Sequence, residues 1–191
     1  MPDTDDDRSM RERMEAGDLY LAEDPEIGEL GIAALDLMEA YNATSSRQKP
    51  LRRQLLGELL GGIGDDTEIR PPLRVDYGSN ITFGARCFAN FGLVALDVAA
   101  ITIGDDVQIG PYVQLLTPTH PLEAEPRRQK WEAAKPITLG DNVWLGGGVI
   151  VCPGVTIGAD TVVGAGSVVT KDLPPGVLAV GNPARVVKSL T

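Results

Sequence analysis

The residue with the clearest catalytic potential is His120, the only histidine in the chain. It lies between Thr119 and Pro121, at the start of a polar segment that interrupts a regular repeat. Imidazole is the side chain best suited to taking up and releasing a proton close to neutral pH. A surface histidine without a role is the alternative, but long excursions from a regular fold often carry function. We therefore expect His120 to take a proton from a substrate.

Acidic and polar residues could accompany His120. Asp76, Asn90 and Asp97 precede it in the chain, and Glu132 lies in the same polar segment. Carboxylates and amides can form hydrogen bonds with the hydroxyl groups of a polar substrate. The alternative is that these side chains cap turns, and for Asn90 in particular both interpretations stay open.

Basic residues gather near the C-terminus of this acidic chain, at Lys171, Arg185 and Lys188. They suggest an anionic ligand such as a nucleotide phosphate, although ordinary solvated charges explain them equally well. Cys87 and Cys152 fall on the repeat, and we expect both to be buried free thiols. A nucleophilic role for Cys152 is not expected, because no second histidine is present to activate it.

The element that must position these residues is a six-residue repeat. Residues 137–172 divide into the units ITLGDN, VWLGGG, VIVCPG, VTIGAD, TVVGAG and SVVTKD. An aliphatic side chain fills the third place of every unit, and glycine fills the fourth place of four units. The period predicts an all-β left-handed parallel β-helix, in which three units form a triangular coil and coils stack about 4.8 Å apart. Glycine is expected where a Cβ would clash with the backbone.

The rest of the repeat is less regular. It is first clear near Val75 and slips by two residues before Ile101, which predicts a small loop at that point. Residues 119–136 then break the pattern with charge and proline, but their length equals one coil, so the register is preserved. We therefore expect a β-helix domain over residues 63–191, with this segment as an extended loop and a short C-terminal cap.

A helical segment is expected over residues 1–62. One helix begins after Ser9, with Glu12 as its capping-box partner. A second helix spans residues 26–42, and a third begins at Pro50. Because helices this short need a partner surface, we expect them to pack on the open first coil of the β-helix.

The charge and hydropathy of the chain exclude several classes of protein. The net charge of −10 argues against a nucleic-acid partner, since a phosphate backbone requires a basic face. No apolar run reaches the ~18 residues of a membrane span, and the N-terminus is acidic, unlike a signal peptide. We expect no membrane partner and a cytoplasmic location. The acidity reflects either an ordinary solvated surface or adaptation to high salt.

Several motifs resemble a known family. The hexads, THP at 119–121 and the closing GNPARVV resemble the hexapeptide-repeat acyltransferases. More narrowly, ERMEAGDLYLAEDPE, YNAT, VDYGSN, FANF and EAAKPITLGDNVWLGGG resemble the maltose and galactoside O-acetyltransferase branch, over residues 9–188. The resemblance implies a homotrimer with active sites between neighbouring subunits. It also implies acetyl-CoA as co-substrate, a small hydroxylated acceptor such as a sugar, and no metal.

The resemblance assigns roles to particular residues. His120 would abstract the proton of an acceptor hydroxyl close to Asn90, and the hydroxyl would attack the thioester directly. Backbone N–H groups near Gly146 and Gly147 would hold the oxyanion. With the polar residues above, the acceptor-side residues are Asp76, Phe88, Asn90, Asp97 and Glu132. The residues implied along acetyl-CoA are Trp144, Gly147, Ala165, Thr170, Lys171 and Arg185.

Departures from the galactoside enzymes concern the acceptor. Those enzymes have tyrosine at Phe88, an acid at Ala22 and methionine at Glu132, where maltose-type enzymes have glutamate. We expect acetyl transfer to be retained despite these changes, but another hydroxyl acceptor, such as a xenobiotic, remains an open alternative.

A single histidine excludes a γ-type carbonic anhydrase, which needs three for its metal. A non-catalytic trimeric scaffold is a further alternative, which His120 and Asn90 disfavour.

Overall fold

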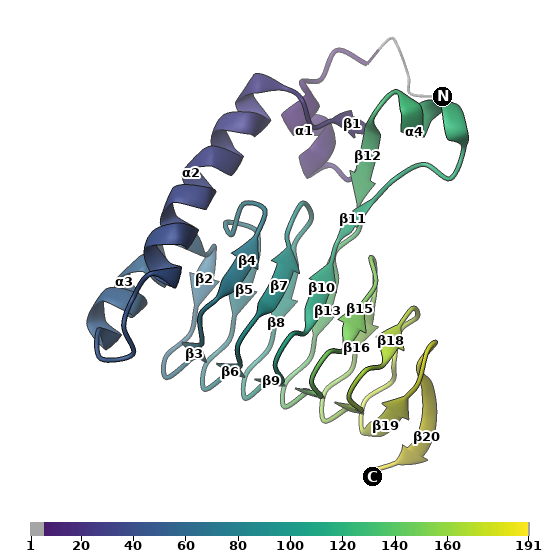
Figure 1. Ribbon diagram of the computed structural model, residues 1–191. Coiled ribbons are helices and arrows are strands. Elements are labelled where there is room, and N and C mark those ends of the chain that lie inside the picture. Colours follow the sequence, from purple (N-terminus) through teal and green to yellow (C-terminus); the bar gives the residue numbers. More distant parts are fainter. Residues whose placement is uncertain (1–5, 191) are drawn as a thin grey trace.

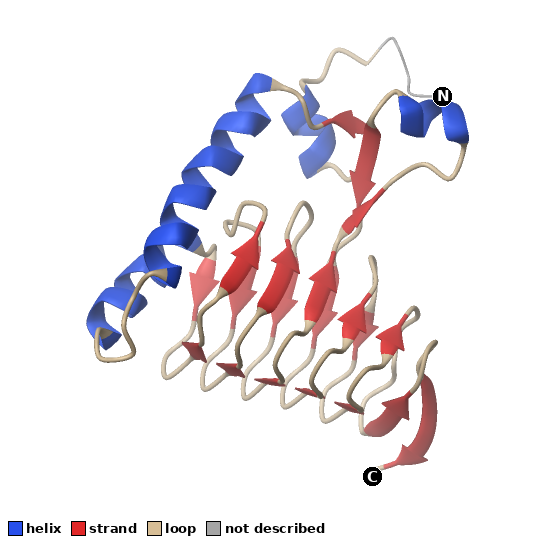
Figure 2. Cartoon of the chain, in the orientation of Figure 1, coloured by secondary structure: helices blue, strands red, loops and turns tan. Residues whose placement is uncertain are grey.

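The chain forms a three-sided solenoid with helices at one end (Figure 1). This is a computed structural model, and it describes residues 6–190. Each side of the solenoid is one sheet, and each coil adds a strand to all three sheets (Figure 2). The predicted left-handed parallel β-helix with a small N-terminal helical cap is confirmed. Residues 1–5 of the predicted helical segment lie outside the described residues.

The strands of each side follow one another along the solenoid. The first sheet contains β2 (Gly62–Ile63), β5 (Ile81–Phe83), β8 (Ile101–Ile103), β13 (Ile137–Leu139) and β16 (Thr156–Ile157). The second contains β3 (Glu68–Ile69), β6 (Phe88–Ala89), β9 (Gln108–Ile109), β14 (Trp144–Leu145), β17 (Val162–Val163), β19 (Val177–Val180) and β20 (Arg185–Ser189). The third contains β4 (Leu73–Val75), β7 (Leu93–Leu96), β10 (Gln114–Leu116), β15 (Ile150–Val151) and β18 (Val168–Val169). Only β20 runs antiparallel to its neighbour in these sheets, and it closes the last coil.

The hexad pattern fills the interior of the solenoid. Side chains at the first and third places, such as Ile137 and Leu139, are buried. The hexad glycine is needed because neighbouring coils touch there: a Cβ on Gly140 would lie 2.6 Å from the backbone nitrogen of Ala159. The left-handed backbone conformation of the corner occurs two residues later, at Asn142 with φ of 55°. The glycine therefore permits close approach of coils and does not itself supply the left-handed turn.

Strand register confirms the slip and the excursion. Ile81 pairs with Ile101 in a coil two residues longer than the one between Thr138 and Thr156. Ile101 pairs directly with Ile137, so the excursion leaves the register unchanged. The coils begin before Val75, where the pattern first becomes clear, because β2 already pairs with β5.

The helical cap is tied to this first coil. The helices are α1 (Met10–Glu15), α2 (Pro25–Asn42) and α3 (Lys49–Leu59), and α1 has the expected Ser9 and Glu12 capping box. The hydroxyl of Tyr41, a fully buried residue, donates to the carbonyl of Ile69. The Asn42 amide accepts from the Leu73 nitrogen and donates to the Leu73 carbonyl, both at 2.8 Å. Two residues of the YNAT motif therefore hold the cap on the solenoid.

Candidate functional site

Three long corners lie side by side on one edge of the solenoid. They comprise residues 76–80, 97–100 and 117–136, and they follow the adjacent strands β4, β7 and β10 (Figure 1). The third corner contains β11 (Pro118–Thr119), α4 (Ala124–Arg128) and β12 (Trp131–Ala134). The register slip and the polar excursion, which fall in successive coils, therefore build one wall.

Asp97 organises this wall from within. Its side chain is fully buried, and Oδ1 accepts from the backbone nitrogens of Asp76 at 3.0 Å and Tyr77 at 2.9 Å. Oδ2 accepts from the Asn80 nitrogen at 3.2 Å. The structure thus gives Asp97 a turn-capping role, which was the alternative to the predicted contact with substrate. A carboxylate with both oxygens engaged by buried amides fixes the loop above it.

The wall gathers acids and tyrosines. Burial, followed by the negative charges of Asp97 and Glu132, raises the pKa of Asp76 to about 6. Burial, followed by the charge of Asp76, raises the pKa of Tyr77 to about 12. Burial also raises the pKa of Tyr20, which donates a hydrogen bond to Oε2 of Glu132 at 3.1 Å. The arrangement presents carboxylates and phenols in a partly desolvated corner.

The hairpin of β11 and β12 brings His120 to this wall. Thr119 pairs with Ala133, so His120 and Glu132 occupy the next positions on the two arms of the hairpin. Glu132 also pairs with Tyr20 of β1 (Tyr20–Leu21), which reaches across from the end of α1. Figure 1 shows α1, β1 and the hairpin together above the corner loops. The His120 side chain is exposed.

A separate groove runs along the second sheet. It has a volume of about 520 Å³, and its lining includes the predicted residues Phe88, Asn90, Trp144, Gly147 and Ala165. Asn90 Oδ1 accepts from the Phe91 nitrogen at 2.9 Å, which leaves the amide nitrogen as a donor. His120 does not line the groove of its own chain. One chain therefore holds the two halves of the predicted site apart.

The two glycines proposed as oxyanion donors differ. The Gly146 N–H donates to the Val163 carbonyl at 2.8 Å within the coil ladder, so it is already engaged. Among residues 6–190, no acceptor lies within hydrogen-bond reach of the Gly147 nitrogen, while the Gly147 carbonyl accepts from the Gly166 nitrogen at 2.9 Å. Gly147 is thus the donor available at the groove.

The remaining residues predicted along acetyl-CoA are not gathered in the groove. Thr170 and Lys171 follow β18 at the edge of the long corners, and Arg185 begins β20. All three are exposed, and none lines the groove of the same chain. The Arg185 guanidinium donates to the Ala184 carbonyl at 2.9 Å.

Comparisons with known proteins agree with this architecture. Residues 13–64 match the family model described as the maltose acetyltransferase hexapeptide capping motif, and residues 136–171 match the bacterial transferase hexapeptide of six repeats. The chain is 48% identical over 179 residues to nodulation protein L of Rhizobium meliloti (strain 1021), covering 94% of this chain and 98% of that protein. It is also 40% identical over 181 residues to galactoside O-acetyltransferase of Escherichia coli (strain K12), covering 95% of this chain and 89% of that protein. The chain belongs to the maltose and galactoside O-acetyltransferase family.

Solved structures of this family superimpose closely. A maltose O-acetyltransferase from Clostridium difficile 630 has a TM-score of 0.95 and 41% identity, covering 97% of this chain and all of that one, 100%. A galactoside acetyltransferase in complex with coenzyme A has a TM-score of 0.93 and 39% identity, covering 96% and 92% of the two chains. As a member of this acetyl-CoA-dependent O-acetyltransferase family, the chain is an acyltransferase, and the scaffold and carbonic anhydrase alternatives are set aside.

Two tyrosines of the wall, Tyr20 and Tyr77, were not proposed as site residues from the sequence. Tyr77 lies within the quoted VDYGSN motif, so its neighbour Asp76 was a usable signal. Tyr20 gives no local signal, because its partner Glu132 is 112 residues away.

The structure of this O-acetyltransferase does not favour thiol or metal chemistry. Both cysteines are free, and Cys87 is buried as expected, but Cys152 is only partly buried, contrary to the expectation. Burial raises the pKa of both thiols, which disfavours the nucleophilic thiolate. Within residues 6–190, no group of three or more His, Cys, Asp or Glu side chains is arranged to hold a metal ion. No helix in that part of the chain is both long and apolar enough to cross a membrane.

Proposed function

We propose that the protein transfers the acetyl group of acetyl-CoA to a hydroxyl group of a sugar, with His120 as the general base. The observation that carries this proposal is the hairpin, which sets His120 and Glu132 at neighbouring positions beside Asp76. A sugar presents several hydroxyl groups that carboxylates can orient by hydrogen bonding. A positioned imidazole then accelerates attack by one of those hydroxyls.

The complete site requires a second subunit. His120 does not line the groove of its own chain, whereas Asn90 and Gly147 do. Because base, oxyanion donor and thioester must meet, we assign a homotrimer in which His120 of one subunit faces the groove of the next. Trp144 and Val187, which are 55% and 58% exposed on the groove sheet, suit burial at such a contact.

The reaction is a direct acyl transfer. His120 takes the proton of the acceptor hydroxyl as its oxygen bonds to the thioester carbonyl carbon. The resulting oxyanion is held by the Gly147 N–H and the Asn90 side-chain amide, which are free to donate at the groove. The carbon–sulfur bond then breaks, and the thiolate of coenzyme A receives the proton from His120. The products are the acetyl ester and free coenzyme A.

The acceptor is held by the wall. Asp76 and Glu132 bind its hydroxyl groups, and Tyr20 orients Glu132 by donating to Oε2. Phe88, whose aromatic ring lies at the groove, supplies an apolar face for a sugar ring. Asp97 acts indirectly, by fixing the backbone of Asp76.

Acetyl-CoA lies along the second sheet in this proposal. Trp144, Gly147 and Ala165 line the groove that would take the pantetheine arm. Thr170, Lys171 and Arg185 extend from the last coils, where their donors and charges would meet the nucleotide phosphates. The galactoside acetyltransferase structure with bound coenzyme A, at 39% identity, supports a cofactor site on this fold.

A thiol-release assay tests the proposal. The protein is incubated with acetyl-CoA and a panel of maltose, glucose, galactosides and non-sugar alcohols, and the ester product is identified by mass spectrometry. We expect acetylation of at least one sugar. Acetylation confined to the non-sugar alcohols would establish the xenobiotic alternative. Release with none of the acceptors, together with no binding of coenzyme A, would contradict the proposed activity.

A further inference from the structure

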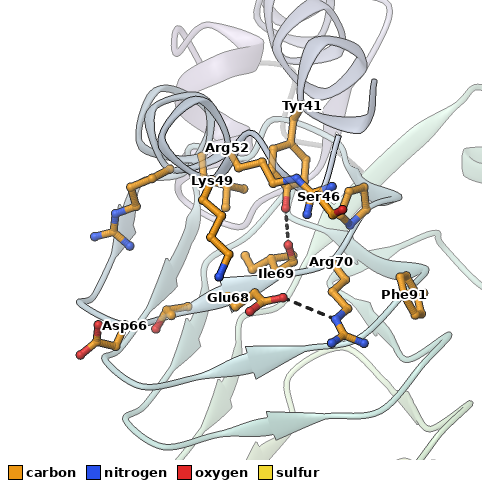
Figure 3. A pocket seen from close by; sticks show the side chains of 13 residues that line it. Tyr41, Ser46, Lys49, Arg52, Asp66, Glu68, Ile69, Arg70 and Phe91 are labelled. Atoms are coloured by element: carbon orange, nitrogen blue, oxygen red, sulfur yellow. Dashed lines mark hydrogen bonds and ion pairs between the residues drawn. The ribbon is translucent and has the colours of Figure 1, made fainter. Parts of the chain in front are cut away.

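A second cavity separates the helical cap from the first coil. Its volume is about 840 Å³, larger than that of the groove on the second sheet. Its roof is the end of α2 and the start of α3, and its floor is β3 with the residues beside it (Figure 3). None of the residues that we assign to acetyl transfer lines it.

The cavity concentrates positive charge in an acidic protein. Lys49, Arg52, Arg53 and Arg70 line it, although the whole chain has only 17 lysines and arginines and a net charge of −10. Two lining acids, Asp66 and Glu68, balance part of this charge. The excess of cations favours an anion at this place.

The hydrogen bonds of the α3 arginines hold them at the cavity, and Arg53 also forms a long ion pair with the exposed Asp65, at 3.8 Å. Arg52 donates to the Thr44 hydroxyl at 2.9 Å and to the Thr44 carbonyl at 3.0 Å. Arg53 donates to the carbonyls of Ile63 and Gly64, both at 2.9 Å. Since both acceptors of Arg52 are neutral, its guanidinium charge remains available to an anion, whereas Asp65 offsets part of the charge of Arg53.

Lys49 provides an exposed cation above the cavity floor. Within the part of the chain that the structure describes, its side chain forms no ion pair or hydrogen bond. Figure 3 shows its side chain descending from α3 toward β3, where Glu68 and Ile69 lie. An ammonium group in this position can follow an anion as a point charge.

Arg70 provides a cation at the edge of the cavity, where its guanidinium group packs on two aromatic rings. Its guanidinium carbon lies 4.9 Å from the ring centroid of Phe88 and 5.2 Å from that of Phe91. Its ion pair with Glu68, at 3.5 Å between largely exposed groups, is weak. Phe91 is 48% exposed and offers an apolar surface beside the cation.

We propose that this cavity binds a small phosphate monoester. Lys49, Arg52 and Arg70 would hold the phosphate, because a dianion is attracted to several cations that line one cavity and guanidinium groups bind phosphate oxygens in pairs. The organic part of the ligand rests on Phe91. The ligand bridges α3 and the first coil, so its binding stabilises the docked cap.

Calorimetric titration of the full-length protein tests this site. Inorganic phosphate, a hexose 6-phosphate and a nucleoside 5′-monophosphate are titrated at fixed ionic strength, with the protein saturated with coenzyme A so that its phosphates occupy any cofactor site. We expect saturable binding of one ester, tighter than that of inorganic phosphate, and a rise in Tm. The ester that binds distinguishes a sugar phosphate from a nucleotide.

Variants decide whether the binding belongs to the cavity. Lys49→Gln/Arg70→Gln should weaken binding roughly tenfold to 100-fold, since two charge-assisted bonds are lost. Arg74→Gln/Lys135→Gln, with the same change in net charge outside the cavity, should bind normally. The exposed single variant Lys49→Met serves if the double variant does not fold. Equal loss in both double variants, binding of inorganic phosphate alone, or no saturable binding would overturn the proposal.

Discussion

The Tyr20 hydroxyl donates a hydrogen bond to Oε2 of Glu132, at 3.1 Å, and so joins the N-terminal segment to the hairpin of His120. Tyr20 is 1% exposed, and the two residues are also direct partners in the pairing of β1 with β12. A side chain outside the β-helix therefore sets the orientation of a proposed acceptor contact.

Replacing Tyr20 with phenylalanine should weaken acceptor recognition without disturbing acetyl-CoA. The loss of a hydrogen bond to a carboxylate costs about 1–2 kcal/mol, or roughly a 5- to 30-fold fall in kcat/KM for the acceptor. Steady-state kinetics with each substrate varied in turn measure this fall, and KM for acetyl-CoA should be unchanged. Tyr112→Phe, at a residue 69% exposed, is the matched control. An equal effect in the control would remove the assigned role.

Asp76 should make the stability of the protein depend on pH. Its folded-state pKa of about 6 lies above the ordinary 3.8, so the folded state holds a proton that the unfolded state has lost between these values. The free energy of unfolding contributed by Asp76 therefore falls as pH rises from 3.8 to about 6, and stays low above that range.

The Asp76→Asn variant tests this linkage. Near neutral pH it should be more stable than the natural protein by ~1–3 kcal/mol, because the buried charge is gone, and the difference should shrink as the pH approaches 4. Urea unfolding at both pH values, at one protein concentration, gives the comparison. A difference that does not vary with pH, or a variant less stable at neutral pH, would contradict the assignment.

The adjacent glycines of the groove should respond differently to alanine. A Cβ on Gly146 would lie 2.5 Å from the Ala165 nitrogen, whereas one on Gly147 meets nothing nearer than Pro111 at 3.4 Å. We expect Gly146→Ala to lose about 2–3 kcal/mol of stability and Gly147→Ala to lose under ~1 kcal/mol, as measured by urea unfolding. Similar losses in the two variants would show that the coils do not approach as closely as the structure indicates.

The sequence predicted the regular coils because each hexad carries its own signal. From Ile137 onward, aliphatic residues at the first and third places identify the interior without knowledge of distant residues. The first coil carries a weaker signal because Gly61 and Thr67 occupy the places where Ile137 and Val143 stand later, which leaves too few aliphatic positions.

The candidate site was only partly predictable, because it depends on contacts between distant segments. His120 and Glu132 could be proposed from one polar segment, but the link from Glu132 to Tyr20 follows from antiparallel pairing across most of the chain. Asp97 looked like a substrate contact, since no local pattern indicates that three amides of the preceding coil already bind it. The cationic cavity likewise combines residues of α3 and β3 that share no motif.

The most direct test of the proposed mechanism is the turnover of His120→Ala with acetyl-CoA and a sugar that the natural protein acetylates. Because His120 is exposed, the variant should keep its oligomeric state in sedimentation and its Tm. We predict that kcat falls roughly 10²- to 10⁴-fold, the range typical for the loss of a general base. A His120→Ala protein that assembles normally and retains the kcat of the natural protein would contradict the account.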